Sequence, residues 1–287
     1  MLMKEYEIKH RIPILCALLF LSLLLLFFLA VRPVGIPPAR REIEAVREAL
    51  SETGRVVHAG GFLWTDSGDL VAYTNSYDAL VNMDEQGNRV CEIDIRETAD
   101  GVLVCAHGDD AHLATGSDLP VTATAQEFAD TLIFGEFLPM TVDMLADFMR
   151  EHPDLYIITD AQGNNLGICR KLAGACPDLR DRFVIQIYHE NEYDAVRAMG
   201  FQSIIYTLYR SEDTERNLWQ VARIAQTHEL VGITAQWELF GSLKNRMAMA
   251  HSGTPYMFHT VDDLHVMEKM LRKPYVYAVY TDFTGAE

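Results

Sequence analysis

Four polar residues in the first half of the chain have types and spacings that suit chemistry. Glu92 and Asp94 alternate within the apolar run 90–95, and His58 and His107 each end an apolar run. Because residues two apart in a strand point to the same side, both carboxylates face one side of this run. Two adjacent carboxylates repel each other, and a hard divalent cation such as Ca²⁺ or Mg²⁺ would neutralise them.

A third carboxylate and the histidines sharpen this prediction. Asp160 closes the run 155–160 and can supply a further oxygen ligand. A Glu-x-Asp pair alone is more often a solvated strand end or part of a salt bridge. Two histidines at strand ends favour a reactive site, because imidazoles that titrate near neutrality can divide the roles of general acid and general base.

These side chains need strands that end at one place. Short apolar runs alternate with longer amphipathic stretches, which is typical of a mostly parallel sheet. The run 102–107 follows its predecessor after a short Asp-Gly turn and is predicted to pair with it antiparallel. The parallel runs predict an α/β fold, a (β/α)₈ TIM barrel, and a doubly wound open sheet is the alternative. The parallel runs are residues 55–58, 90–95, 155–160, 183–188, 203–209, 230–236, 256–261 and 277–283.

The N-terminal region has a different composition. Residues 12–31 form an uncharged apolar run that is long enough, at about 1.5 Å per residue, to span a bilayer as a single helix. Arg32 follows at once, without a small-residue cleavage site, so a signal anchor is favoured over a cleaved signal peptide. The expected organisation is a cytoplasmic segment 1–11, the transmembrane helix, a spacer 32–41 and an extracytoplasmic barrel 42–287.

Charge and cysteine content exclude other classes of protein. The formal net charge is −17, which argues against a nucleic-acid partner and means that an anionic substrate needs a local cation. Five cysteines form an odd set without CxxC pairs, so a disulfide framework is not expected. The oligomeric state is not predicted.

Around the polar residues the chain resembles the glycerophosphodiester phosphodiesterase family and the wider phosphatidylinositol-specific phospholipase C-like barrels. Their pattern is His-Arg, Glu-x-Asp, a Thr-x-Asp-Gly hairpin and a final His. The matching segments are His58-Ala59, Glu92-Ile93-Asp94, Thr98-Ala99-Asp100-Gly101 and His107, and residues 73–76 resemble the family's Glu-Asn-Thr segment.

The resemblance implies a metal-dependent phosphoric diester hydrolase. Glu92, Asp94 and Asp160 would hold the divalent cation, and His58 and His107 would act as the acid–base pair. The order of the two histidines stays open. Further candidates to shape the substrate pocket lie at the ends of later strands: Gln162, Gln186, Tyr188, Tyr209, Trp237 and His259. For Tyr209 and Trp237 a role as packed aromatics is favoured, and for Gln162 and His259 a structural role is an equal alternative.

Two positions depart from the family pattern. The Arg that follows the first His is Ala59 here, and the Lys often found two residues after the third-strand acid is Gln162. Both replacements remove a cation, so either another base such as Arg210 contacts the phosphate, or the substrate differs, or the activity is weak. Asp282 is expected to anchor the loop after the last strand.

Three functions remain from the sequence. The first is a membrane-anchored phosphodiesterase that cleaves glycerophosphodiesters or phospholipid head groups, with a substrate that is lipid-derived. The second is a catalytically weak or inactive head-group-binding module of the same fold, which the missing cations favour. The third, glycoside hydrolysis by the carboxylates, is disfavoured by the two histidines.

Overall fold

The structure is a computed structural model, and it describes residues 41–211 and 217–283 together with Ser22. The chain divides into two units, Met1–Ile36 and Pro37–Glu287. Apart from Ser22, the expected anchor at residues 12–31 lies outside the described residues. Within the described part of the chain, no helix combines the length and the apolar character needed to cross a membrane.

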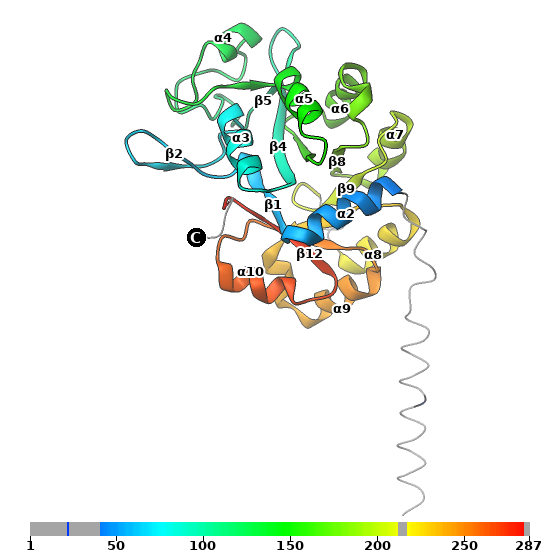
Figure 1. Cartoon of the computed structure of the whole chain (residues 1–287). Coiled ribbons are helices and arrows are strands. Elements are labelled where there is room, and N and C mark those ends of the chain that lie inside the picture. Colours follow the sequence, from blue (N-terminus) through cyan, green and yellow to red (C-terminus); the bar gives the residue numbers. More distant parts are fainter. Residues whose placement is uncertain (1–21, 23–40, 212–216, 284–287) are drawn as a thin grey trace, which may run out of the picture. The chain divides into compact units, whose positions relative to one another are not determined.

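Eight parallel strands close into a barrel in the second unit (Figure 1). They are β1 (Arg55–Val57), β4 (Val90–Glu97), β7 (Tyr156–Ala161), β8 (Phe183–Ile187), β9 (Ile204–Thr207), β10 (Gly232–Gln236), β11 (Tyr256–His259) and β12 (Val276–Thr281). β1 pairs with both β12 and β4, which joins the two ends of the sheet. Each predicted run overlaps one of these strands. The predicted barrel is confirmed, and the doubly wound alternative is wrong.

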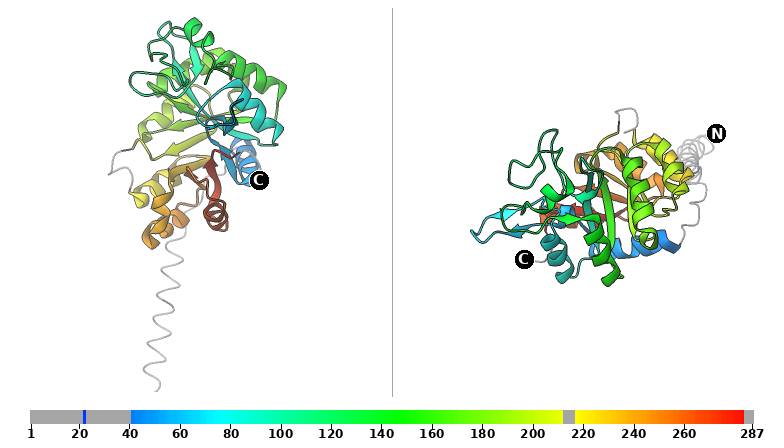
Figure 2. Two further views of the ribbon diagram at one scale, coloured as in Figure 1. Left: turned by 90° about the vertical axis from the view of Figure 1, so that its left-hand side faces the viewer. Right: turned by 90° about the horizontal axis from the view of Figure 1, so that it is seen from above.

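Helices follow the strands and pack around the barrel (Figures 1 and 2). Several begin at a residue whose side chain accepts from a backbone N–H of the first turn, as Ser76, Asn164 and Asp263 do. The helices of the outer layer are α3 (Tyr77–Glu85), α5 (Val142–Glu151), α6 (Asn165–Ala175), α7 (Tyr193–Ala198), α8 (Leu218–Thr227), α9 (Leu243–Ser252) and α10 (Leu264–Leu271).

One further helix, α2 (Arg41–Thr53), precedes the barrel and closes its N-terminal end. Its apolar residues recur at helical spacing, and Val46 and Leu50 are fully buried among the inward side chains of the strand starts. Arg47 Nε also donates a hydrogen bond of 3.0 Å to the carbonyl oxygen of Val231. Because α2 and apolar side chains fill this end, the polar side chains of the barrel interior lie at the opposite, C-terminal end of the strands.

The barrel interior is built in layers because alternate residues of each strand point inward. The layer next to α2 is apolar, and the layer above it is polar. The apolar layer includes Val90, Ile158, Val184, Ile205, Met257 and Ala278, and the next inward residues of the same strands are Glu92, Asp160, Gln186, Thr207, His259 and Tyr280.

A hairpin extends the second parallel strand. β5 (Leu103–Cys105) pairs antiparallel with β4, as predicted, and β6 (Met140–Thr141) pairs antiparallel with β5. The turn is stabilised by Thr98, whose hydroxyl donates to Asp100 Oδ1 at 2.7 Å. β5 leads directly to His107, so the hairpin returns this residue to the open end of the barrel. The excursion between β5 and β6 includes α4 (Ala125–Ala129), and a second hairpin, β2 (Leu63–Trp64) with β3 (Leu70–Val71), lies between β1 and α3.

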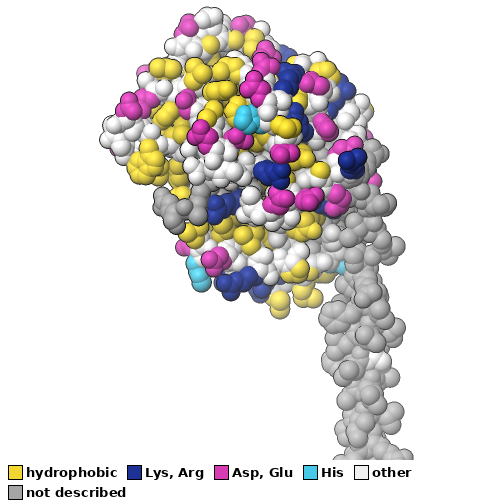
Figure 3. All heavy atoms as spheres, in the orientation of Figure 1, with side chains coloured by type: hydrophobic (Ala, Val, Ile, Leu, Met, Phe, Trp, Pro, Cys, Tyr) yellow, Lys and Arg dark blue, Asp and Glu magenta, His cyan; other side chains and the backbone are white. Residues whose placement is uncertain are grey.

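The surface agrees with the composition. On the face shown in Figure 3, Lys and Arg side chains of the described residues are interspersed with Asp and Glu. This arrangement presents no continuous basic patch on the described part of that face.

Candidate active site

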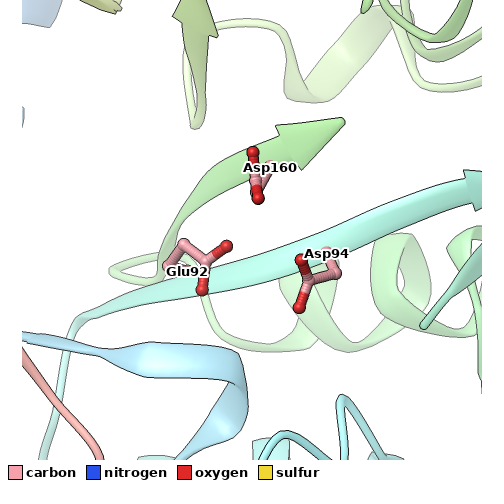
Figure 4. Close-up of side chains that lie close together, drawn as sticks. All are labelled: Glu92, Asp94 and Asp160. Atoms are coloured by element: carbon pink, nitrogen blue, oxygen red, sulfur yellow. The ribbon is translucent and has the colours of Figure 1, made fainter. Parts of the chain in front are cut away.

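Three carboxylates converge at the open end of the barrel (Figure 4). Glu92 and Asp94 come from β4 and Asp160 from the neighbouring β7, and one oxygen of each lies within 4.8 Å of the others. All three side chains are buried. Burial and the charge of Asp94 raise the pKa of Glu92 well above its ordinary value, and burial and Asp160 raise that of Asp94 to about 6. A set of three carboxylates that offers only oxygen ligands fits a hard divalent cation.

Two loop residues fix the β4 carboxylates. The backbone N–H of Ala59 donates to Glu92 Oε2 at 3.1 Å. Asn75 Nδ2 donates to Asp94 Oδ2, and Asn75 Oδ1 accepts from the backbone N–H of Asp94, both at 2.9 Å. Ala59 and Asn75 both have a φ of 48°, in the left-handed region, so the loop accepts backbone strain at the positions that contact the carboxylates.

Neutral donors surround the third carboxylate. Gln162 Nε2 donates to Asp160 Oδ2 at 2.8 Å and also to Asp94 Oδ1, so it bridges the two strands. The hydroxyl of Tyr209 lies 2.7 Å from both oxygens of Asp160, and that of Tyr188 also donates to it. Sequence reasoning placed these three residues in the site, and the structure brings each of them to the carboxylates.

His58 is held by a partner from the other end of the chain. Its Nδ1 lies 2.8 Å from Asp282 Oδ1, and its Nε2 lies 3.9 Å from Glu92 Oε2. Burial alone would lower the pKa of His58, but the hydrogen bond to Asp282 and the charges of Glu92, Asp282 and Asp94 outweigh it and raise the pKa to about 9. Asp282 therefore does more than anchor the last loop. Its hydrogen bond orients the imidazole of His58, and its charge favours the protonated form of that ring.

Tyr73 contacts both histidines. Its ring lies edge-on to His58, with centroids 4.7 Å apart, and edge-on to His107 at 5.7 Å. Tyr73 has a φ of 58° and is 40 % exposed, so it faces the solvent side of the site. Both imidazoles therefore lie within one aromatic contact of the same residue.

Arg210 supplies a cation at the same end of the barrel. Its guanidinium lies 4.6 Å from the centre of the Tyr188 ring and 5.0 Å from that of Tyr209. Its Nη2 is 3.5 Å from Asp160 Oδ2. Ala59 brings no charge to the site, and Arg210 reaches it from the segment after β9.

These groups line one cavity of about 220 Å³. Trp237 does not line it; this residue begins the short helix η4 (Trp237–Gly241) and is 44 % exposed. Thr207, Thr234 and Tyr280 line it but were not singled out in the sequence, although the period of two along each strand points to them. The predicted site residues that line the cavity are His58, Glu92, Asp94, His107, Asp160, Gln162, Gln186, Tyr209 and His259.

Comparisons with known proteins give a clear result for structure. No family model matches the sequence, and no curated protein matches it. Among solved structures, the glycerophosphodiester phosphodiesterase of Agrobacterium tumefaciens is 17% identical with a TM-score of 0.59, covering 80% of this chain and 96% of that one. The enzyme of Thermotoga maritima is 16% identical with a TM-score of 0.60, covering 80% and 95%.

The chain has the glycerophosphodiester phosphodiesterase fold. A phosphodiesterase of Oleispira antarctica, solved in complex with the product sn-glycerol-3-phosphate, shares this fold at 15% identity with a TM-score of 0.58, covering 80% of this chain and 93% of that one. The resemblance seen in the sequence is therefore confirmed for the glycerophosphodiester phosphodiesterase fold. At this identity the likeness shows the fold, and the chemistry has to be argued from the site.

Proposed function

We propose that the protein is a divalent-cation-dependent phosphodiesterase that cleaves glycerophosphodiesters or phospholipid head groups. The observation that carries this proposal is the convergence of a buried trio, Glu92, Asp94 and Asp160, with His58 and His107 in one cavity. The trio would hold Ca²⁺ or Mg²⁺, which when bound would stabilise negative charge on a phosphoryl oxygen. The fold shared with solved phosphodiesterases supports the same class of reaction.

His58 is the better candidate for the general acid. Its Nδ1 is held by Asp282, whose carboxylate favours the protonated ring and raises the pKa of His58, and its Nε2 lies on the side of the carboxylate trio, 3.9 Å from Glu92 Oε2. Nε2 would then give its proton to the departing alcohol oxygen. His107, which also contacts Tyr73, would take a proton from the attacking water or from a neighbouring hydroxyl of the substrate.

Arg210 would bind the phosphate group. Because the side chain presents several N–H donors in a plane, it can keep its bond to the carbonyl oxygen of Ala161, at 2.6 Å, and still offer donors to the cavity that it lines. Stacking against Tyr188 and Tyr209 limits its rotation. This residue would restore the cation that Ala59 lacks.

The test is ³¹P NMR of the purified full chain with glycerophosphocholine or phosphatidylinositol, in the presence of Mg²⁺ or Ca²⁺. We expect a phosphomonoester or cyclic phosphate signal, and we expect His58→Ala, His107→Ala and Glu92→Gln to slow its appearance by about 10²-fold or more. His265→Ala, on an exposed position of α10, is the matched control and should be unchanged. Binding of the diester without any cleavage would overturn the proposal in favour of a head-group-binding module.

The proposal includes a membrane location. The apolar run 12–31 would anchor the chain as a single-pass protein, with the barrel outside the cytoplasm and close to a lipid-derived substrate. Membranes washed at alkaline pH should retain the chain, and added protease should reach the barrel from the extracytoplasmic side. Release of the chain by the wash, or cleavage only after the membrane is opened, would contradict this location.

A further inference from the structure

Gln162 lies among the inward carboxylates of two neighbouring strands, whose side chains Figure 4 shows. Its backbone N–H donates to the carbonyl oxygen of Ile95 at 2.8 Å, which extends the pairing of β7 with β4. Because Gln162 follows Asp160 by two residues, its side chain points into the cavity as well. Its Nε2 donates to Asp160 Oδ2 at 2.8 Å and also to Asp94 Oδ1. The amide therefore bridges two of the three carboxylates that would hold the cation.

The amide of Gln162 has two ends of nearly the same shape and opposite chemistry. The nitrogen donates hydrogen bonds, and the oxygen accepts them. A half-turn about the last side-chain bond exchanges the two atoms, so Oε1 can occupy the position from which Nε2 reaches Asp94 and Asp160. Carboxylates alone favour the nitrogen at this position. A hard cation held by the same carboxylates favours the oxygen, because glutamine carbonyl oxygens are among the ligands of Ca²⁺.

The contacts of Gln162 permit this turn. Among the described residues, its Oε1 accepts one hydrogen bond, a long one of 3.4 Å from Nη2 of Arg210. Arg210 keeps its shorter bond of 2.6 Å to the carbonyl oxygen of Ala161 when Oε1 turns away. Asn75 is fixed by contrast, since its Nδ2 donates to Asp94 Oδ2 while its Oδ1 accepts from the backbone N–H of Asp94. A turn of that amide would break both bonds.

Other neighbours of the carboxylates are less suited to bind the cation. The hydroxyls of Tyr188 and Tyr209 both donate to Asp160, and burial raises the pKa of each, so both stay neutral phenols at neutral pH. A fourth carboxylate would add charge to a trio whose members already repel each other, as the raised pKa of Asp94 indicates. Gln162 offers an oxygen and adds no charge.

We propose that Gln162 is a fourth ligand of the divalent cation and binds it through Oε1. This inference rests on the proposed function in that Glu92, Asp94 and Asp160 hold the cation. It gives Gln162 a role at the metal rather than at the substrate. An additional protein ligand takes a coordination position that water would otherwise fill.

The test counts the water molecules on a bound lanthanide ion. Eu³⁺ takes hard oxygen ligands as Ca²⁺ does, and its luminescence lifetimes in H₂O and D₂O give the number of coordinated waters. The full chain is mixed with less Eu³⁺ than protein, so that the tightest site fills first. Gln162→Met keeps the length of the side chain and replaces the amide by a soft thioether. We expect this variant to carry about one more water than the wild type, because water replaces the lost oxygen.

A second variant separates a metal ligand from a residue that only positions the carboxylates. Gln162→Glu keeps an oxygen for the metal but has no N–H to donate to Asp94 or Asp160. If Gln162 is a ligand, Gln162→Glu keeps the wild-type water count. A count in Gln162→Glu that matches Gln162→Met, or equal counts in the wild type and Gln162→Met, would overturn the proposal. Calorimetry with Mg²⁺ should also show about 10-fold weaker binding by Gln162→Met than by the wild type.

Two control variants account for other effects. Gln126→Met removes an amide on α4 that also donates to an aspartate, Asp130, at 3.0 Å, and it should keep the wild-type water count. Asp94→Asn removes one carboxylate of the trio and gives the signal of Eu³⁺ held elsewhere on this acidic chain. A wild-type signal equal to that of Asp94→Asn would refute both the cation site and the fourth ligand.

Failure of the fourth ligand and failure of the proposed function give different results. A chain that cleaves diesters but has equal water counts in the wild type and Gln162→Met would refute the ligand and leave the phosphodiesterase standing. A chain that shows the expected counts in all variants but cleaves no diester would support the ligand and refute the reaction.

Discussion

The pair formed by His58 and Asp282 allows a direct test of what raises the pKa of His58. The pKa of His58 is raised from 6.5 to about 9, and because one pKa unit corresponds to about 1.36 kcal/mol, the folded chain holds this proton more tightly by about 3 kcal/mol. Asp282 contributes both the hydrogen bond and one of the three nearby negative charges. We therefore expect Asp282→Asn, which keeps the shape and removes the charge, to lower the pKa of His58 by at least about one unit.

The assay is an NMR titration of the imidazole Cε1–H of His58 in the metal-free chain. Asp118→Asn is the control, because Asp118 is an exposed aspartate and its loss changes the net charge by the same amount. A pKa of His58 that is the same in Asp282→Asn as in the wild type would refute the claim that Asp282 charges this imidazole. So would a wild-type value near 6.5.

Three further predictions follow from the same contacts. Because the pKa of His58 is raised on folding, its contribution to stability is complete below pH 6.5 and is lost as the pH rises through about 9. Urea titrations of the metal-free wild type should therefore show a free energy of unfolding that falls across this pH window. The same titrations of Asp282→Asn should show a smaller fall. Arg210→Met should lower kcat/KM for a diester by about 10- to 100-fold through the loss of a charged hydrogen bond, whereas Arg223→Met on the exposed face of α8 should not. Mg²⁺ at a hundred times its Kd should stabilise the chain by about 2.7 kcal/mol and raise its Tm by several degrees, and Asp94→Asn should abolish this shift in a thermal melt.

The fold could be predicted because each barrel strand has a recognisable pattern of apolar and polar residues in its own short run. Runs such as 90–95 and 155–160 are largely apolar on the outward face. On the inward face they change from apolar to acidic near their ends, which places Glu92 and Asp160 at the open end of a barrel. The antiparallel hairpin could also be predicted, because the link after Ile95 is too short for a helical crossover.

The contacts that tune the site could not be predicted in the same way. Asp282 reaches His58 across 224 residues, a proximity that only closure of the barrel creates. Asn75 reaches Asp94 because its backbone adopts a left-handed conformation, which the residue type alone does not predict. Thr207 could have been found, since it lies two residues before Tyr209 on the same inward face. The anchor at residues 12–31 stays a prediction.

The rate of diester cleavage as a cation is restored tests the central claim most directly. The full chain would be stripped of metal with a chelator, and Mg²⁺ or Ca²⁺ would then be added back while release of phosphomonoester or cyclic phosphate is followed. We predict that the rate rises from background to a plateau and that Glu92→Gln stays at background throughout. A metal-stripped chain that cleaves the diester as fast as the restored one would contradict the account.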